Sequence, residues 1–483
     1  MKLKGRRPIY TSEKVITRDN ILKVLAKAMS LHLVNRRQIV YLQNYEKGVQ
    51  PILQRKKDVR PEINNKIVEN HANEIKTFYS GYIFSKGVSY VQRAEKDIMG
   101  NAADVDDRKI SALNEMFFEE GKTSKDQELA NDFLTTGVGY RMLLPRKKIY
   151  GISPFYLLHL DVRNTFVIYS ADVFHNRLAG VTFYQDDDRV VHWTVYTDTE
   201  VYFIEGNNFT CPQFVKKVEK NYIGLVPIVE YKCNFERMGI FERVIPLLDA
   251  LNRCTSDRLN ALEQFVNAFI WMNNVDLDET QANELKDKLM LLTQNVDGTN
   301  QASVQYLTAD LNQQDTETLS TYLYNQILQI AGVPSREGSA SGETGVAVEY
   351  RNGWQIASTN ASTIENAFEI SERELLKVAI EIINKSHIPN VDMNGLLISD
   401  ISVKSARSRT DNFVSKVQGI AQGIQAGIHP KHMIAISGLF PDPQQVYMDS
   451  KPFLEKWLIS ASMFDNGEAD DEPDDEKVNG NES

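Results

Sequence analysis

The chain has 483 residues, of which 42% are hydrophobic and 25% charged, a balance typical of a globular protein with several structural regions. Its formal net charge of −11 argues against a protein that gains affinity for nucleic acid by neutralising phosphates, but does not exclude one that acts on DNA without binding it tightly. Three widely spaced cysteines, Cys211, Cys233 and Cys254, favour neither a disulfide framework nor a zinc site, and they indicate folding in a reducing cytosol.

The sequence predicts neither a membrane span nor a signal peptide. No apolar run approaches the ~20 residues that span a bilayer, and the basic start MKLKGRRPIY lacks the apolar region of a signal peptide. We expect residues 1–17 to form a flexible basic arm. Two helices are predicted next, about Ile21–Leu33 and Asn35–Tyr45, followed by a turn that Gly48 and Pro51 mark.

A third helix is predicted from apolar residues at helical spacing between Ile63 and Phe78, with Gly81 as its end. His71 lies on this apolar stripe, and we interpret it as a packed core histidine because no second metal ligand stands at a useful spacing. The following residues predict a short hairpin around Lys86–Gly87. A helical pattern then returns over Ile110–Thr136.

Between Tyr140 and Tyr231 the hydrophobic period shortens to two. Seven runs of β-branched and aromatic residues, separated by Asp, Asn and Gly turns, predict an antiparallel sheet region. The stretch GVGYRM (137–142) does not predict a dinucleotide site, because it lacks the third glycine and follows a helix. Three adjacent carboxylates, Asp186, Asp187 and Asp188, fall in a turn between strands, where a solvated turn is favoured over a metal site.

An amphipathic helix over Phe241–Val266 is the element around which the chain is organised. At about 1.5 Å per residue it is a rod of order 40 Å. A second amphipathic helix, about Asp315–Ala331, returns after the insert Asn267–Gln313. This insert is predicted as a strand, a helix over Thr280–Leu292, a turn and a strand. The apolar stripe of the first rod contains Ile245, Leu248, Leu251, Leu259, Leu262 and Val266, and its polar side contains Asp249, Arg253, Asp257, Asn260 and Gln264.

A Ser- and Gly-rich loop follows Pro334 and opens into a long helix over about Val346–Lys385, with kinks expected at Gly353 and within 358–362. The loop is not a phosphate-binding loop, since no Gly-Lys-Ser/Thr follows it. A strand pair within 395–405 and a helix over Asp411–Gly427 are predicted next. The acidic, apolar-poor tail from Asp465 is expected to be disordered.

No motif for a hydrolase nucleophile, a metalloprotease, a nucleotide-binding loop or a kinase is present, and His429 and His432 fit a structural role. Catalysis, cofactors and metals are therefore not predicted. Two alternatives stay open: a helical scaffold protein without a channel, and a metal-dependent nuclease that uses Asp186–Asp188.

Four stretches, in their order along the chain, resemble the portal proteins of tailed phages, specifically the group like the portal of the Bacillus phage SPP1. They are YEKGVQPILQRK, INNKIVENHANEIKTFYSGYIFSKGVSY (63–90), VPIVEYKCNFERMGIFERVIPLLDALNRCTSDRLNALEQF (226–265) and GVPSREGSASGETGVAVEYR. In the second stretch, Ser85-Lys86-Gly87 stands where that group usually has Gly-x-Pro. The likeness covers roughly residues 20–450.

The resemblance implies an α+β portal fold with long stem helices, an antiparallel β-rich wing, a small α/β clip insert and a helical crown. It divides the chain into the arm (1–17), wing (18–240), stem helices (241–266 and 314–332), clip (267–313), tunnel loop (333–345), long wing helix (346–389), C-terminal wing and crown (390–464) and acidic tail (465–483).

The resemblance further implies a homo-oligomeric ring, usually a dodecamer, at one vertex of the capsid of a virion that is assembled in the host cytoplasm. Double-stranded DNA would pass through the ring without sequence specificity during packaging and ejection. The implied partners are the large terminase subunit and a head-completion adaptor, which dock at the clip, together with the major capsid and scaffolding proteins.

Two sets of residues are implied as sites. The DNA-channel set is the tunnel loop Ser335, Arg336, Glu337, Gly338, Ser339, Ala340, Ser341, Gly342 and Glu343, and the docking set in the clip is Asp276, Asp278, Glu279, Lys286 and Lys288. A conduit must not bind DNA tightly, because each neutralised phosphate adds affinity that acts as friction. Neutral Ser and Gly residues at a constriction fit this need. Arg336 departs from it, and two interpretations stay open: contact with a phosphate, or pairing with a neighbouring acid, which is favoured slightly.

Overall fold

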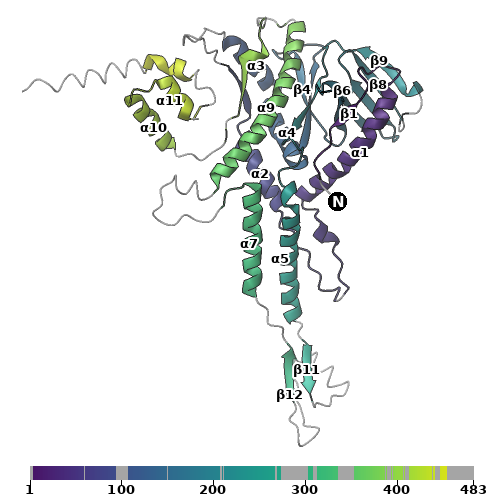
Figure 1. The fold of residues 1–483 in the computed structure, drawn as a ribbon, viewed down its shortest axis with the longest axis vertical. Coiled ribbons are helices and arrows are strands. Elements are labelled where there is room, and N and C mark those ends of the chain that lie inside the picture. The colour runs from purple at the N-terminus through teal and green to yellow at the C-terminus, as the bar shows by residue number, and fades with distance from the viewer. Residues whose placement is uncertain are drawn as a thin grey trace, which may run out of the picture.

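The structure is a computed structural model that describes residues 4–58, 60–93, 107–149, 151–206, 209, 212–266, 269–273, 303–307, 313–335, 353–386, 388, 393, 395–405, 407, 413–437, 439–440 and 446–453. Figure 1 shows a mixed body from which two long helices project side by side as a stalk, with a two-stranded ribbon at its tip. The mixed helix-and-sheet class predicted from the sequence is confirmed.

Two sheets form the β-rich part of the body. The larger has the order β1-β5-β6-β7-β8-β9, with β1 parallel to β5 and every other pair antiparallel, and the smaller is antiparallel with the order β10-β3-β4. Their bounds are β1 Ile9–Thr11, β3 Val138–Pro145, β4 Phe155–Leu160, β5 Thr165–Ser170, β6 Arg177–Gln185, β7 Val191–Tyr196, β8 Glu200–Glu205, β9 Val215–Lys220 and β10 Ile228–Lys232. All seven predicted strands are present. The mostly charged edge strand β9 was missed, because an edge strand needs pairing on one side only and its charges discourage pairing on the other.

The N-terminal segment is not a free arm over the described residues 4–17, so that prediction is wrong there. Ile9–Thr11 adds a strand to the larger sheet. The buried Arg6 guanidinium donates from Nη2 to the Glu242 carboxylate at 2.6 and 2.8 Å, and from Nη1 to the Thr136 carbonyl at 2.8 Å. One of the basic residues that suggested a solvated arm, Arg6, is thus buried and paired inside the protein, while Lys4 and Arg7 are exposed.

Three further local predictions are corrected by the structure. Helix α1 (Ile21–Glu46) is one helix where two were predicted, since no Gly or Pro interrupts its centre. Residues 63–70 are not helical, and helix α2 (His71–Phe84) runs through Gly81 instead of ending there. The hairpin around Lys86–Gly87 does not form, because β2 (Val88–Gln92) pairs with the distant β13 (Ile401–Ser405). The turn at Gly48 is confirmed by its φ of +89°, and η1 (Pro51–Gln54) follows it.

The main core lies where helices cover the smaller sheet. Helices α3 (Asp107–Glu119) and α4 (Lys122–Thr136) and the long α9 (Trp354–Lys385) pack there with α2, and α9 contacts β3 and β10. The first half of α1 packs on the larger sheet, through Ile21, Val24, Leu25 and Ala28, while its last turns join the main core through Leu42 and Tyr45. Gly353 is the N-cap of α9 with a φ of +81°, and the part of the predicted long helix before it lies outside the described residues.

The stalk begins with η3 (Glu242–Val244) and α5 (Ile245–Val266), passes through the ribbon β11 (Phe269–Asn273) and β12 (Ser303–Leu307), and returns as α7 (Gln313–Ala331). Both predicted stalk helices and both strands of the insert are confirmed, while the predicted helix Thr280–Leu292 lies outside the described residues. Beyond α9 come η4 (Ile398–Asp400), β13, α10 (Phe413–Gln425) and α11 (Pro430–Ser437). In the part of the chain described here, no helix is long and apolar enough to cross a membrane.

Candidate functional site: the reinforced stalk

The upper end of the stalk is fixed to the body by apolar packing. Ile245, Leu248 and Leu251 of α5 and Ile327 and Leu328 of α7 are buried in the main core. The hydroxyl of Tyr79 in α2 lies 3.0 Å from the carbonyl oxygens of both Ala331 and Gly332, close enough to donate to either. Gly332 ends α7 with a φ of +68°, where a Cβ would lie 2.2 Å from the Asn360 side chain, so glycine is required at this joint.

Below this joint α5 buries polar side chains. Asn252, Ser256 and Asn260, spaced four residues apart, have exposed fractions of 0%, 0% and 2%. Each accepts a hydrogen bond from a backbone N–H of an extended segment that lies along the helix. The donors are Glu69 to Asn252 at 2.8 Å, Ile67 to Ser256 at 2.9 Å and Asn65 to Asn260 at 2.7 Å. We call residues 51–70 the strap and these three bonds the polar ladder.

The spacing of the ladder follows from backbone geometry. Two residues of extended chain advance about 6.6 Å, and four residues of α-helix advance about 6.0 Å. Alternate N–H groups of the strap therefore meet side chains one helical turn apart. A buried N–H without a hydrogen-bond partner is costly. The ladder supplies partners for three strap N–H groups that pair with no neighbouring β-strand.

Side-chain contacts brace both ends of the ladder. Asn252 donates to Gln50, and the Thr255 hydroxyl donates to the Glu69 carboxylate. Arg55 pairs with Asp257 at 2.5 Å, with both side chains partly exposed. The strap thus forms a third layer along the stalk, beside α5 and across it from α7 (Figure 1).

A charged junction joins α2, the strap and α7. The two ring nitrogens of His71 lie 3.1 Å from Glu69 and 2.6 Å from Glu74, and the ring lies 4.6 Å, centroid to centroid, from that of Tyr324 in α7. Burial by itself would lower the pKa of His71, but the hydrogen bonds and negative charges of the two carboxylates outweigh it, and the pKa is raised. The histidine is thus an ion-pair centre, where the sequence predicted a packed core residue.

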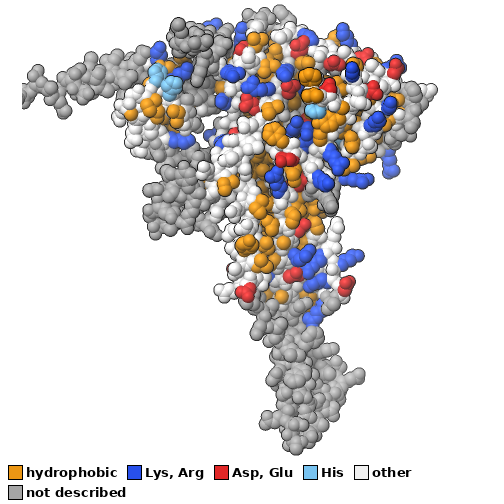
Figure 2. Space-filling view, in the orientation of Figure 1, with side chains coloured by type: hydrophobic (Ala, Val, Ile, Leu, Met, Phe, Trp, Pro, Cys, Tyr) orange, Lys and Arg blue, Asp and Glu red, His pale blue; other side chains and the backbone are white. Residues whose placement is uncertain are grey.

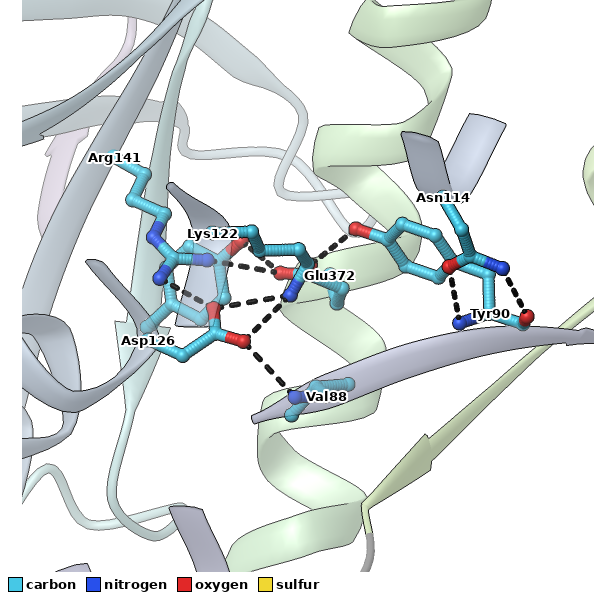
Figure 3. Close-up of polar contacts among 8 residues, drawn as sticks. Val88, Tyr90, Asn114, Lys122, Asp126, Arg141 and Glu372 are labelled. Atoms are coloured by element: carbon cyan, nitrogen blue, oxygen red, sulfur yellow. Dashed lines mark hydrogen bonds and ion pairs between the residues drawn. The ribbon is translucent and has the colours of Figure 1, made fainter. Parts of the chain in front are cut away.

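A second ionic cluster fixes α9 to the body (Figure 3). Asp126 of α4 lies between Lys122 at 2.8 Å and Arg141 of β3 at 2.6 Å, and Lys122 also lies 3.1 Å from Glu372 of α9. The hydroxyls of Tyr90 and Tyr231 donate to the same Glu372 carboxylate. Although burial opposes ionisation, the two cations hold the pKa of Asp126 below its ordinary value. Two basic and two acidic side chains thus meet in this buried cluster.

The outer surface of the stalk keeps apolar side chains in solvent. Leu319, Tyr322 and Ile330 of α7 are 50%, 58% and 54% exposed, and Leu262 of α5 is 41% exposed. Orange hydrophobic side chains along the stalk are visible in Figure 2. Exposed apolar residues that recur along one helix face are typical of a surface that meets a partner.

Few of the predicted site residues lie among the described residues. Ser335 is half-buried beyond the end of α7, and the rest of the predicted tunnel loop, 336–343, lies outside the described residues, as do the predicted docking residues Asp276, Asp278, Glu279, Lys286 and Lys288. Asp186–Asp188 fall in the turn between β6 and β7, as predicted. Asp186 lies 2.7 Å from His192 and accepts from the Val190 N–H at 2.8 Å. Nowhere in the described ranges do three metal-ligating side chains gather.

The ladder residues and the ionic cluster were missed from the sequence. One signal was available for the ladder: Asn252, Ser256 and Asn260 repeat at a four-residue interval, which places them on one stripe of the helix. Asn260 was assigned to the solvent side because polar residues usually lie there. For the cluster the sequence gives only the i,i+4 pair Lys122 and Asp126, since Glu372 comes from α9, far along the chain.

These features define an elongated α+β protein whose mixed body carries a reinforced two-helix stalk. The family model described as phage portal protein, SPP1 Gp6-like, matches residues 30–440, so the chain belongs to this family and is a phage portal protein. This agrees with the resemblance found in the sequence.

Solved structures that are similar to the chain include two at low sequence identity. One is from the virion of a native gene transfer agent particle, with a TM-score of 0.43, 12% identity, and coverage of 84% of this chain and 94% of that chain. The other is from the neck of the native particle computed with C12 symmetry, with a TM-score of 0.42, 10% identity and the same coverage. No curated protein sequence matches the chain.

Proposed function

We propose that this portal protein forms a ring at one capsid vertex, with the stalk helices as the wall of a channel through which double-stranded DNA enters and leaves. Membership of the portal family is the observation that carries the proposal. A channel wall must keep its shape while DNA moves past it. The strap and polar ladder meet this need, because they brace α5 over at least two helical turns below the body.

In this proposal the stalk is the stem, residues 267–313 are the clip, and 333–345 are the tunnel loop that faces the DNA. The body before the stalk and α9 form the wing, and the segments beyond form the crown. The clip, including Asp276, Asp278, Glu279, Lys286 and Lys288, takes the large terminase subunit and later a head-completion adaptor. Twelve subunits per ring, contacts to capsid and scaffolding proteins, assembly in the host cytoplasm and the lack of catalysis belong to the same proposal.

The test combines microscopy with a packaging assay. Electron micrographs of the purified protein should show rings with a central channel, whereas only monomers or dimers over a range of salt concentrations would contradict the proposal. Deletion of 338–342 should leave ring formation intact and abolish DNA packaging. A scaffold protein without a channel would tolerate the same deletion.

A further inference from the structure

We infer that the strap of each subunit is the docking surface for the exposed face of α7 of the next subunit in the ring. This inference rests on the proposed ring. It assigns the strap a second role besides bracing its own stalk, and it names the partner as a second copy of this chain.

The strap and α7 lie on different sides of α5. The strap contacts one side of α5 through the polar ladder, and α7 packs along another side of α5. In Figure 1 the strap and α7 lie at opposite edges of the stalk, with α5 between them. A closed ring of identical subunits requires two different and complementary surfaces at opposite edges, because each head-to-tail contact joins one edge to the other.

Both surfaces expose apolar side chains. The lateral surface of α7 exposes Leu319 and Tyr322, by 50% and 58%. The upper strap and the turn before it expose Leu53 and Val49, by 40% and 57%. All four side chains are exposed by 40% or more, and contact between subunits would remove them from water.

The two surfaces also carry opposite charges at their lower ends. At the lower end of the strap the backbone is extended, and alternate side chains point in opposite directions. Arg55 and Lys57 bond within the subunit, to Asp257 and to the Ile63 carbonyl, while Lys56 between them is exposed. The lower end of α7 carries the exposed carboxylate of Glu317, 66% accessible. Figure 2 shows Lys and Arg side chains gathered at the strap edge of the stalk.

The two surfaces also agree in height along the stalk. Arg55 and Glu317 reach adjacent residues of α5, Asp257 and Arg258, so the basic and acidic ends lie level. Gln50 contacts Asn252, which lies one to two turns above Asp257 on α5. Leu53 comes between Gln50 and Arg55 in the chain and so lies between these two heights. Tyr322 lies in the same interval, below Tyr324, which reaches Glu74 at the upper junction. Neighbours related by rotation about an axis along the stalk therefore meet apolar to apolar and charge to opposite charge.

Cross-linking tests this contact. The variant Leu53→Cys/Tyr322→Cys, assembled and treated with a short bis-maleimide, should give a series of covalent multimers on a denaturing gel. A link within one subunit is prevented, since α5, with a diameter of about 10 Å, lies between the two sites. The parent protein and each single variant are controls for Cys211, Cys233 and Cys254. Leu53→Cys/Ile330→Cys is the mismatched control, because Ile330 lies about 12 Å higher on α7 than Tyr322.

Charge reversal gives a second measurement on the intact chain. Lys56→Glu and Glu317→Lys should each lower the ring fraction several-fold at limiting protein concentration, and the double variant should recover most of it. Arg258→Gln, which removes the ion pair with Glu317 within the subunit, should leave ring formation unchanged. Rings that form normally but give no multimers above the controls, and no recovery in the double variant, would overturn the strap contact alone. Absence of rings in the parent protein would overturn the proposed function as well.

Discussion

The hydroxyl of Ser256 provides the sharpest test of the polar ladder. It accepts the Ile67 N–H at 2.9 Å and donates to the Asn252 carbonyl in its own helix at 2.7 Å. Ser256→Ala removes the only side-chain atom that receives this N–H and changes little else in volume. The Ile67 N–H then lies against α5 without the hydrogen-bond acceptor that it has in the parent protein.

The expected cost follows from the environment of the two groups. Ser256 is fully buried and Ile67 is half-buried, so the unpaired N–H should cost about 1–2 kcal/mol, the lower part of the range for an unsatisfied buried donor. This corresponds to a roughly 5- to 30-fold increase in local opening of the strap. Hydrogen–deuterium exchange of the peptide that covers residues 63–70 measures this opening directly.

A matched control separates loss of the ladder from loss of any buried hydroxyl. Ser371 is also buried in a long helix, but its hydroxyl bonds only to the Ala367 carbonyl of the same helix. Ser371→Ala should leave exchange in the strap unchanged. If Ser256→Ala gives the same strap protection as the parent protein, the ladder does not hold the strap and the reasoning about its geometry is refuted.

Three further predictions concern the junctions and the outer surface. The raised pKa of His71 means that its protonated form stabilises the fold. This contribution is complete below the unfolded pKa near ~6.5 and is lost as the pH rises through the higher folded pKa. The stability advantage over His71→Gln should therefore shrink as the pH rises above ~6.5 in denaturant titrations, and parallel curves would contradict it. Arg141→Met leaves Lys122 as the one remaining cation beside Asp126 and Glu372 in the cluster of Figure 3. It should lower the unfolding free energy by about 3–5 kcal/mol, with partial recovery when Glu372→Gln is added. A loss below about 1 kcal/mol would show that ion pairs do not hold the cluster together. Leu262→Asp, at a position 41% exposed, should cost the isolated subunit less than about 1 kcal/mol yet abolish rings in light scattering, and normal rings would show that the stem assignment is wrong.

The sequence predicted the regular elements well wherever local pattern decides the structure. The seven aromatic and β-branched runs form strands, and the amphipathic periods of α5 and α7 form the two stalk helices. Local pattern failed where a distant segment supplies the partner. Residues 63–70 have helical spacing of apolar residues, but the ladder on α5 takes their N–H groups and holds them extended. Propensity is a weak prior that such tertiary contacts override.

The same cause explains the errors at the N-terminus and at β2. Arg6 looks like part of a solvated basic arm until Glu242, more than two hundred residues away, is placed beside it. Val88–Gln92 lacks a hairpin partner nearby because its partner is β13. The charges of the cluster around Asp126 likewise come from α4, β3 and α9, so only the fold brings them together. The candidate tunnel-loop and clip residues stay predictions from family resemblance.

The geometry of the polar ladder restricts how the length of this stalk can change. One added hydrogen bond, or rung, of the ladder requires four more residues in α5 but two more in the strap segment that donates to it. α7 must also gain four residues to keep its packing against α5. Single-residue insertions would turn the next ladder side chain about 100° away from the strap. The two advances also differ by about 0.6 Å per rung, so the mismatch reaches about 3 Å after five rungs, enough to break a hydrogen bond. Natural variation in stalk length should therefore occur in steps of a helical turn, and longer stalks need a different brace.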